Sequence, residues 1–153
     1  MSKLDSGGQS DDSKRILIPI EGHSLELKLC QLFLDLAKAK KYKLTFFHVK
    51  TPETEIEKIL NRLKEDIRKK GVEAQIQIVP GEDPAREILK ESGKQYDLIA
   101  MVSRIKALKK ELFGSVTNKV ARSAKCNVMV FHNVEKLPKK LNKILVPIFL
   151  PNR

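Results

Sequence analysis

The 153-residue sequence contains no tryptophan and only two tyrosines. Nucleobases of single-stranded nucleic acids stack on such rings, so their scarcity argues against recognition of a single strand. The net charge of +11 would by itself favour a nucleic-acid partner. However, the lysines are spread over all the predicted helices and are interleaved with glutamates, as in residues 53–70. This arrangement indicates a solvated, charge-rich surface, and we expect no specific nucleic-acid partner.

Long apolar runs are also absent, because no stretch approaches the about 20 residues that a membrane-spanning helix needs. The polar residues 1–14 contain no hydrophobic segment of the kind found in signal peptides. We therefore expect a cytoplasmic protein that does not insert into a membrane. Residues 1–14 are expected to form a flexible tail.

Cysteine is scarce too, with only Cys30 and Cys126 in the chain. The two thiols show no metal-ligand spacing and fit a reducing compartment. Free cysteines are most often core residues, so we expect both to be buried structural thiols and not nucleophiles. His48 has no serine or cysteine identifiably paired with it, and we expect a structural role for it as well.

What the sequence does contain is a regular alternation of apolar, strand-length runs with amphipathic helical segments. Strands are predicted at residues 15–20, 44–49, 72–79, 97–102 and 128–131, and the helices between them begin near residues 24, 53, 83 and 115. The runs at 15–20 and 97–102 are continuously apolar, as in strands buried on both faces, whereas 72–79 alternates and fits a sheet edge. This order predicts an α/β fold, a doubly wound five-stranded parallel sheet with helices on both faces.

The carboxyl ends of the strands are where doubly wound sheets bind ligands, at the point where the strand order reverses. The residues expected at that edge are Glu21, His48, Val49, residues 101–104 and residues 114–115. Asp97 begins its strand and would lie at the opposite edge. The sequence therefore indicates no acid–base pair between Glu21 and Asp97.

Residues 96–131 are the part of the chain most suggestive of a ligand site, because a strand, a basic loop and a helix follow one another there. Gly114 and Ser115 open the helix, where unpaired N–H groups and the helix dipole favour a phosphate. The loop cations that could hold an anion at the same place are Arg104, Lys106, Lys109 and Lys110. The simpler alternative is a solvated basic loop.

Three segments of the sequence carry a resemblance to a known family: residues 16–22, residues 44–49, and residues 97–102 continuing into 114–120. In order and spacing they resemble the universal stress protein family over residues 15–131. The resemblance implies an adenine nucleotide alpha hydrolase-like fold for that domain. It also implies a homodimer formed through the last strand, because family members commonly pair across the apolar edge that residues 128–131 would form here.

The same resemblance implies a nucleotide site for ATP or AMP. Nucleotide-binding members look like Gly-x-x-Gly, nine residues, and then Gly-Ser or Gly-Thr. Counting back from Gly114 puts Met101 and Arg104 at the first two glycines, and a one-residue deletion puts Val102 and Ile105 there. Because side chains of this size keep the backbone away from phosphates, we expect a degenerate site. The candidate site residues are Glu21, in place of the family's first-strand aspartate, Gly22, Val49, Met101, Ser103, Arg104, Gly114, Ser115, Val116 and Thr117.

From these residues we expect a universal-stress-type regulatory or ligand-sensing domain that is not an enzyme. One alternative is an ATP- or AMP-binding stress protein that hydrolyses ATP slowly. Another is an anion-binding accessory domain of a larger protein, such as a transporter. Steep salt dependence of binding would distinguish an anion-binding protein acting through the basic loop from the other two.

The last residues echo the first strand, because residues 143–148 repeat the apolar pattern around a proline that residues 15–20 show. Such an echo predicts either a terminal strand or the start of a second repeat at residues 143–153. Residues 132–142 would then be a basic linker. On the second interpretation, the chain would be part of a tandem or larger protein.

Overall fold

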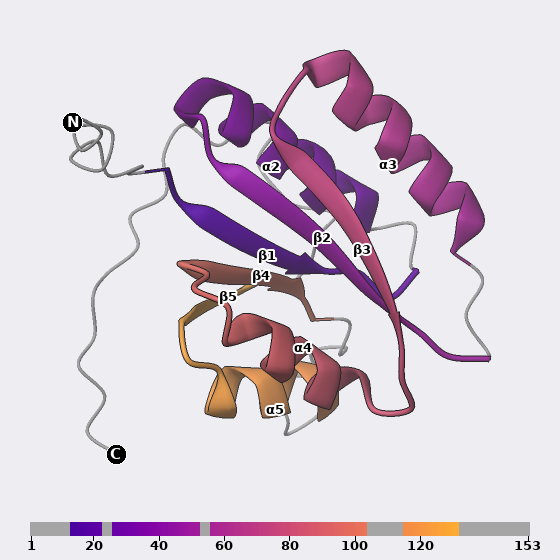
Figure 1. The fold of residues 1–153 in the computed structure, drawn as a ribbon, viewed down its shortest axis with the longest axis vertical. Coiled ribbons are helices and arrows are strands. Elements are labelled where there is room, and N and C mark those ends of the chain that lie inside the picture. The colour runs from indigo at the N-terminus through magenta and orange to yellow at the C-terminus, as the bar shows by residue number, and fades with distance from the viewer. Residues whose placement is uncertain (1–12, 23–25, 53–55, 104–114, 132–153) are drawn as a thin grey trace, which may run out of the picture.

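The computed structural model describes residues 13–22, 26–52, 56–103 and 115–131, which form a five-stranded parallel sheet flanked by helices (Figure 1). The elements along the chain are β1 Arg15–Pro19, α2 Glu26–Lys40, β2 Lys43–Lys50, α3 Glu57–Lys70, β3 Ala74–Pro80, α4 Pro84–Ser92, β4 Leu98–Val102, α5 Ser115–Ser123 and β5 Asn127–Phe131. The predicted fold class is therefore confirmed.

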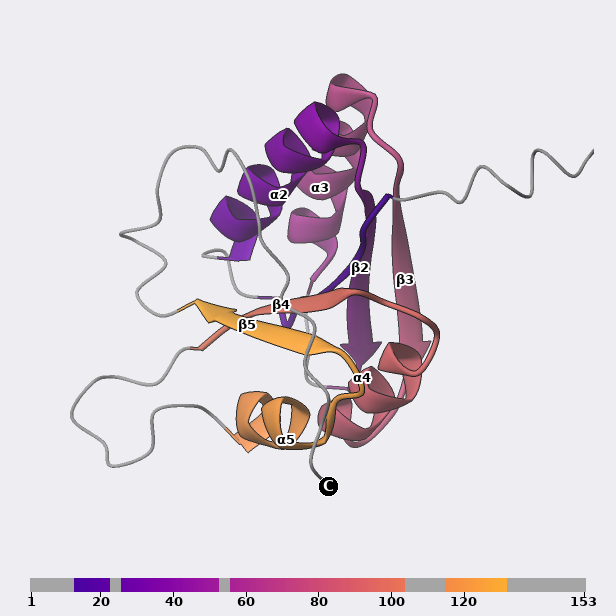
Figure 2. The ribbon, with the colours of Figure 1, turned by 90° about the vertical axis from the view of Figure 1, so that its left-hand side faces the viewer.

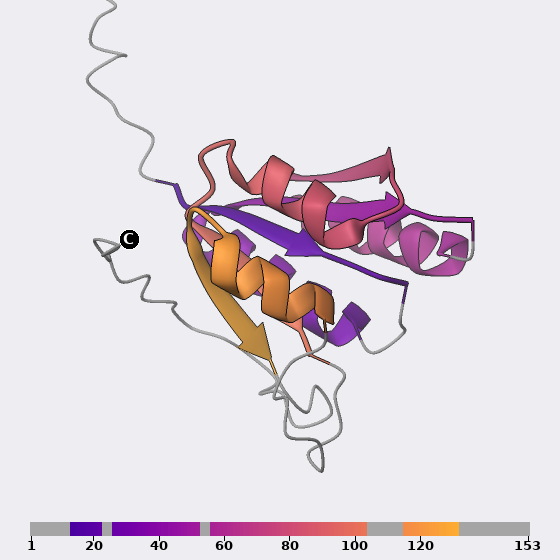
Figure 3. The ribbon, with the colours of Figure 1, turned by 90° about the horizontal axis from the view of Figure 1, so that it is seen from below.

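The strands lie in the order β3-β2-β1-β4-β5, and every pair is parallel. Helices α2 and α3 cover one face of the sheet, and α4 and α5 cover the other (Figure 2). Seen from below, α4 and α5 lie across the sheet from α2 and α3 (Figure 3). The chain runs from β1 to β2 and β3 on one side of β1 and then crosses to β4 on the other side of β1. The strand order therefore reverses between β1 and β4.

Two hydrophobic cores lie on the two faces of the sheet, and β1 contributes to both. Ile16 and Ile18 pack towards α2 and α3, while Leu17 packs in the core under α4 and α5. Burial on both faces explains why β1 and β4 are continuously apolar. Strand β3 lies at a sheet edge and none of its residues is fully buried, which confirms the prediction from its alternating pattern.

The end of α3 and the start of α4 fall where the sequence predicts them. Gly71 ends α3 with a left-handed φ of 66°, and its N–H donates to the Ile67 carbonyl at 3.0 Å. Asp83 caps α4 by accepting a hydrogen bond from the Arg86 N–H at 3.3 Å, ahead of Pro84. Helix α3 begins at Glu57, after the predicted start at residue 53, and residues 53–55 lie outside the described part of the chain.

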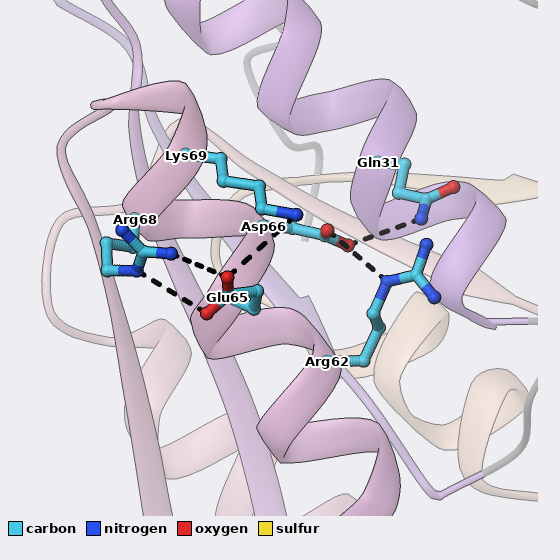
Figure 4. A network of polar contacts seen from close by, with 6 residues as sticks. All are labelled: Gln31, Arg62, Glu65, Asp66, Arg68 and Lys69. Atoms are coloured by element: carbon cyan, nitrogen blue, oxygen red, sulfur yellow. Dashed lines mark hydrogen bonds and ion pairs between the residues drawn. The ribbon is translucent and has the colours of Figure 1, made fainter.

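Charged side chains of helix α3 form hydrogen bonds and ion pairs at its surface (Figure 4). Asp66 accepts from Gln31 of α2 at 3.2 Å and from Arg62 at 3.4 Å, so it connects the two helices. Glu65 pairs with Arg68 at 2.6 Å one turn along the same helix. Exposed pairs of this kind contribute little to stability, about 0–1 kcal/mol each. The charge-rich surface predicted for this segment is confirmed, and the helix is held by its apolar face.

The two thiols differ in burial. Cys30 is fully buried as predicted, whereas Cys126 is only half-buried, so the prediction of burial is wrong for Cys126. Burial raises the pKa of the Cys30 thiol well above its usual range, and burial together with nearby Asp97 raises the pKa of Cys126 to about 11. Both thiols are therefore protonated near neutral pH, and neither has the thiolate character of a nucleophile.

Neither a metal-binding cluster nor a membrane-spanning helix is found in the described ranges. No group of three or more histidine, cysteine or acidic residues there could hold a metal ion. The helices described here are all too short or too polar to cross a membrane.

Candidate functional site

The candidate site begins where β1 and β4 part at their carboxyl ends. The registered pairs between these strands are Ile16 with Leu98 and Leu17 with Ile99, at the beginning of each strand. Ile20 donates its N–H to Phe47 of β2 at 2.8 Å, so the N–H of residue 20 faces β2.

Pro19 explains why the pairing between β1 and β4 stops. Successive residues of a strand point their backbone groups to opposite neighbours, so the nitrogen of Pro19 faces β4. A proline nitrogen carries no hydrogen and cannot extend the ladder. The sheet therefore opens at the point where its strand order reverses, and this is where doubly wound sheets form ligand crevices.

A cleft of about 190 Å³ occupies this opening. Its lining comes from the ends of β1, β2 and β4, from the loops after β1 and β2, from the first turn of α2 and from α4: Pro19, Ile20, Glu21, Glu26, Phe47, His48, Val49, Thr51, Pro84, Ile88, Met101 and Val102. Most of this surface is apolar. The polar groups are two carboxylates, one imidazole and one hydroxyl, and no lysine or arginine is among the lining residues that the structure describes.

Three of the residues predicted from sequence line the cleft together: Glu21, Val49 and Met101. Glu21 is exposed, while Val49 and Met101 are 6% and 4% exposed and form its apolar wall. Gly22 lies beside the cleft at a φ of 105°, a backbone conformation that glycine adopts without strain. The predicted meeting of these strand ends is thus observed.

The remaining predicted residues are placed elsewhere or are not described. Ser103 is buried, and its N–H donates to the Phe131 carbonyl at 2.9 Å, which extends the pairing of β4 with β5. Ser115 is exposed at the start of α5, Val116 packs against the core, and Thr117 is buried. The cleft lining does not include these four residues. Arg104 and Gly114 lie outside the described residues, as do the basic loop and residues 132–153.

Glu26 is a site residue whose role the sequence interpretation missed. Its side chain is 4% exposed, and both carboxylate oxygens accept the N–H of Glu21 at 2.9 Å. Oxygen Oε1 also accepts the N–H of Gly22 at 3.0 Å. The carboxylate thus holds the turn after β1 from the first turn of α2, much as the glutamate of a capping box reaches back to free N–H groups. An acidic residue four positions after a glycine turn was the available signal.

His48 also lines the cleft, although the sequence assigned it a structural role. His48 is 1% exposed, and its Nδ1 lies 2.8 Å from the Ile20 carbonyl oxygen. That bond ties the end of β2 to the end of β1, so a structural contact exists.

The two carboxylates singled out from sequence lie at opposite ends of the sheet, as expected. Asp97 Oδ2 accepts the N–H of Arg15 at 2.8 Å, at the start of β1, whereas Glu21 follows the end of β1. The two groups are therefore separated by the length of a strand. They cannot share a substrate as an acid and a base.

The sequence and the fold of this chain are both similar to those of known proteins. Residues 12–132 match the family model described as Universal stress protein family. The chain is 31% identical over 144 residues to the universal stress protein YxiE of Bacillus subtilis strain 168, a match that covers 76% of this chain and 97% of the relative.

Solved structures with the same fold include a universal stress protein in complex with cAMP, with a TM-score of 0.64, 21% identity, and coverage of 78% of this chain and 97% of that one. Another is a family protein from Arabidopsis thaliana with AMP bound, with a TM-score of 0.60, 16% identity, and coverage of 82% and 96%. At these identities the likeness is one of fold, and it agrees with the five-stranded sheet described above.

Proposed function

The chain belongs to the universal stress protein family, and from this premise we propose that its cleft binds the nucleoside part of an adenine nucleotide. The protein would act as a regulatory, ligand-sensing domain and not as an enzyme. The observation that carries the proposal is the opening between β1 and β4, which brings Glu21, Val49 and Met101 together around one cleft. The fold relatives with bound cAMP and AMP support the choice of ligand class.

The size and lining of the cleft favour a nucleoside over a phosphate. A volume of about 190 Å³ is below the ~300–1,000 Å³ of pockets that enclose drug-sized ligands, so a whole triphosphate would not fit within it. Carboxylates in the lining repel phosphates, and nothing cationic among the described lining residues offsets them. Val102 adds a side chain to the wall at the position where the one-residue deletion aligns it with a family glycine. We therefore propose that monophosphates bind better than ATP.

Calorimetric titration tests this proposal with AMP, cAMP and Mg-ATP on the full chain. AMP or cAMP should bind with a saturable heat, and Val102→Trp should weaken that binding at least about tenfold by filling the cleft. Val72→Trp is the matched control, because Val72 is also half-buried against the α2–α3 core but lies just before the start of β3, at the far end of the sheet. Equal binding by wild type and Val102→Trp would place the nucleotide elsewhere. Phosphate release from ATP should not exceed that of buffer.

We also propose that the protein forms a homodimer through β5. This strand lies at a sheet edge, pairs with β4, and presents only half-buried residues, four of them the apolar Val128, Met129, Val130 and Phe131. An apolar edge strand without charges is a template for pairing with another strand.

Light scattering coupled to size-exclusion chromatography tests the dimer. Val130→Lys should shift the protein to a monomer, because a charge would be buried in the interface. Ile78→Lys is the control on the opposite edge, where Ile78 is 45% exposed on β3, and it should leave the mass unchanged. A monomeric wild type, or a monomer produced by Ile78→Lys alone, would contradict the use of β5.

A further inference from the structure

His48 lines the cleft, and its buried nitrogen Nε2 has no use assigned so far. Its Nδ1 lies 2.8 Å from the Ile20 carbonyl oxygen, and a carbonyl can only accept a hydrogen bond. Nδ1 therefore carries a proton. In the neutral imidazole the other nitrogen, Nε2, is then an acceptor with a free lone pair.

This second nitrogen has no hydrogen-bond partner among the described residues, and it is shielded from solvent. Among the described residues, it is the only buried side-chain nitrogen or oxygen without a hydrogen-bond partner. Most buried polar side-chain atoms are paired, and leaving one unpaired is costly, so each exception calls for an explanation. Because His48 is a lining residue of the cleft, a bound ligand is the partner available to it once the side chains that cover Nε2 move aside.

The other polar groups around the cleft narrow the kind of ligand. Glu21 and Glu26 contribute carboxylates, and Thr51 contributes a hydroxyl. The oxygens of Glu26 already accept the backbone N–H groups of Glu21 and Gly22. A phosphate offers only acceptors and would meet carboxylates here, whereas an N–H or O–H group would find an acceptor in His48 Nε2.

The geometry points to His48 Nε2 as a specificity-determining acceptor that receives a hydrogen bond from an amino or hydroxyl group of the bound nucleoside. This inference rests on the proposed nucleoside site and deepens it. A ligand that supplies the donor satisfies the imidazole, and a ligand that lacks it leaves both the imidazole and the cleft poorly paired. Selection among nucleosides is therefore made by the base or the sugar.

Two substitutions separate the acceptor from the structural bond. In His48→Asn, the side-chain amide can still donate to the Ile20 carbonyl, but nothing reaches the place of Nε2. In His48→Gln, the longer side chain brings an amide oxygen near that place. Loss of one well-made hydrogen bond should weaken adenosine binding about tenfold in His48→Asn, and His48→Gln should remain within about threefold of wild type. Thermal melts of both variants confirm that they are folded.

The ligand series identifies the donor. Wild type and His48→Asn are titrated with adenosine, purine riboside, 2′-deoxyadenosine and 3′-deoxyadenosine, which lack the amino group or one hydroxyl in turn. For the analogue that lacks the donor, the about tenfold penalty of His48→Asn should disappear, because the two changes remove the same bond. The ¹⁵N resonance of His48 Nε2 in the wild-type protein should also move on adding adenosine, while that of Nδ1 stays in place. This readout needs no variant.

The outcomes are distinct. Adenosine binding that is equal in wild type and His48→Asn, with an unmoved Nε2 resonance, would overturn the role of His48 and leave the nucleoside site standing. A penalty that is the same for all four nucleosides would also overturn it, because it would reflect a change of cleft shape. If wild type binds none of the nucleosides or nucleotides, both the site and the role of His48 fall.

Discussion

Phe33→Ala will lower the free energy of unfolding by about 4 kcal/mol. Phe33 lies on α2, is fully buried, and packs in the core between the sheet and α2 and α3. Its ring meets that of Phe131 edge to face, with 6.1 Å between the ring centres and an angle of 89°. The substitution removes apolar surface, leaves a cavity and breaks this ring pair, so it affects both α2 and the end of β5. Urea unfolding followed by circular dichroism measures the loss.

Phe131→Ala is the matched control for this prediction. Phe131 is half-buried on an edge strand, so the same truncation should cost only about 1–2 kcal/mol. The double substitution should cost less than the sum, by about the ~0.5–1.5 kcal/mol that edge-to-face pairs contribute. A loss below about 2 kcal/mol for Phe33→Ala would show that α2 collapses onto the vacated space. It would then be a poor anchor for the turn that borders the cleft.

Much of the fold could be predicted from the sequence because its signals are local. Period and length distinguish helices from strands, and Gly71 and Asp83 mark helix ends by their own backbone and side-chain chemistry. The edge position of β3 followed from the alternation of its residues, since one wet face leaves a trace in the sequence. The burial of Cys126 was predicted wrongly because this residue lies in the bend just before β5, where no periodic residue pattern reports burial.

The site was harder to predict because its parts interact across the sheet. Glu21, Val49 and Met101 could be placed at one edge from topology alone, and they do line the cleft. The partners of Glu26 and His48 are backbone groups of other elements, and such contacts exist only after β1 and β2 have paired. A histidine inside an apolar strand predicts burial, but which nitrogen is satisfied depends on the position of a carbonyl 28 residues away in the chain.

The charge pattern shows the same division between local and long-range information. Most charged residues do form a solvated surface, as interleaved lysines and glutamates suggest. Glu26 and Glu91 are exceptions, at 4% and 5% exposed. Glu91 accepts from the Tyr96 hydroxyl at 2.7 Å and pairs with Lys94 at 2.9 Å, so its burial is compensated by specific partners. Although the net charge of the protein is +11, two carboxylates, those of Glu21 and Glu26, line its candidate binding cleft.

Glu26→Leu tests whether the carboxylate beside the cleft is an organising group. Replacing a buried charge by an apolar residue can stabilise a protein, because the carboxylate no longer has to be desolvated. Here the hydrogen-bond partners of Glu26 decide whether the substitution raises or lowers the stability. The N–H groups of Glu21 and Gly22 both depend on the Glu26 oxygens, and leucine would leave these donors without that acceptor. Because Glu21 is exposed, water can compensate in part, so we expect a loss of stability of about 2 kcal/mol.

Glu26→Gln separates the contribution of charge from that of hydrogen bonding. Its amide oxygen can still accept an N–H at nearly the same place, so it should lose only about 1 kcal/mol in the same urea titration. Both variants should weaken AMP binding, and leucine should do so more, because the turn that carries Glu21 forms one wall of the cleft. If Glu26→Leu instead raises the stability, desolvation of the carboxylate outweighs its hydrogen bonds. Glu26 would then be a group kept at a cost to the fold, which would strengthen the case that ligand binding is the reason it is there.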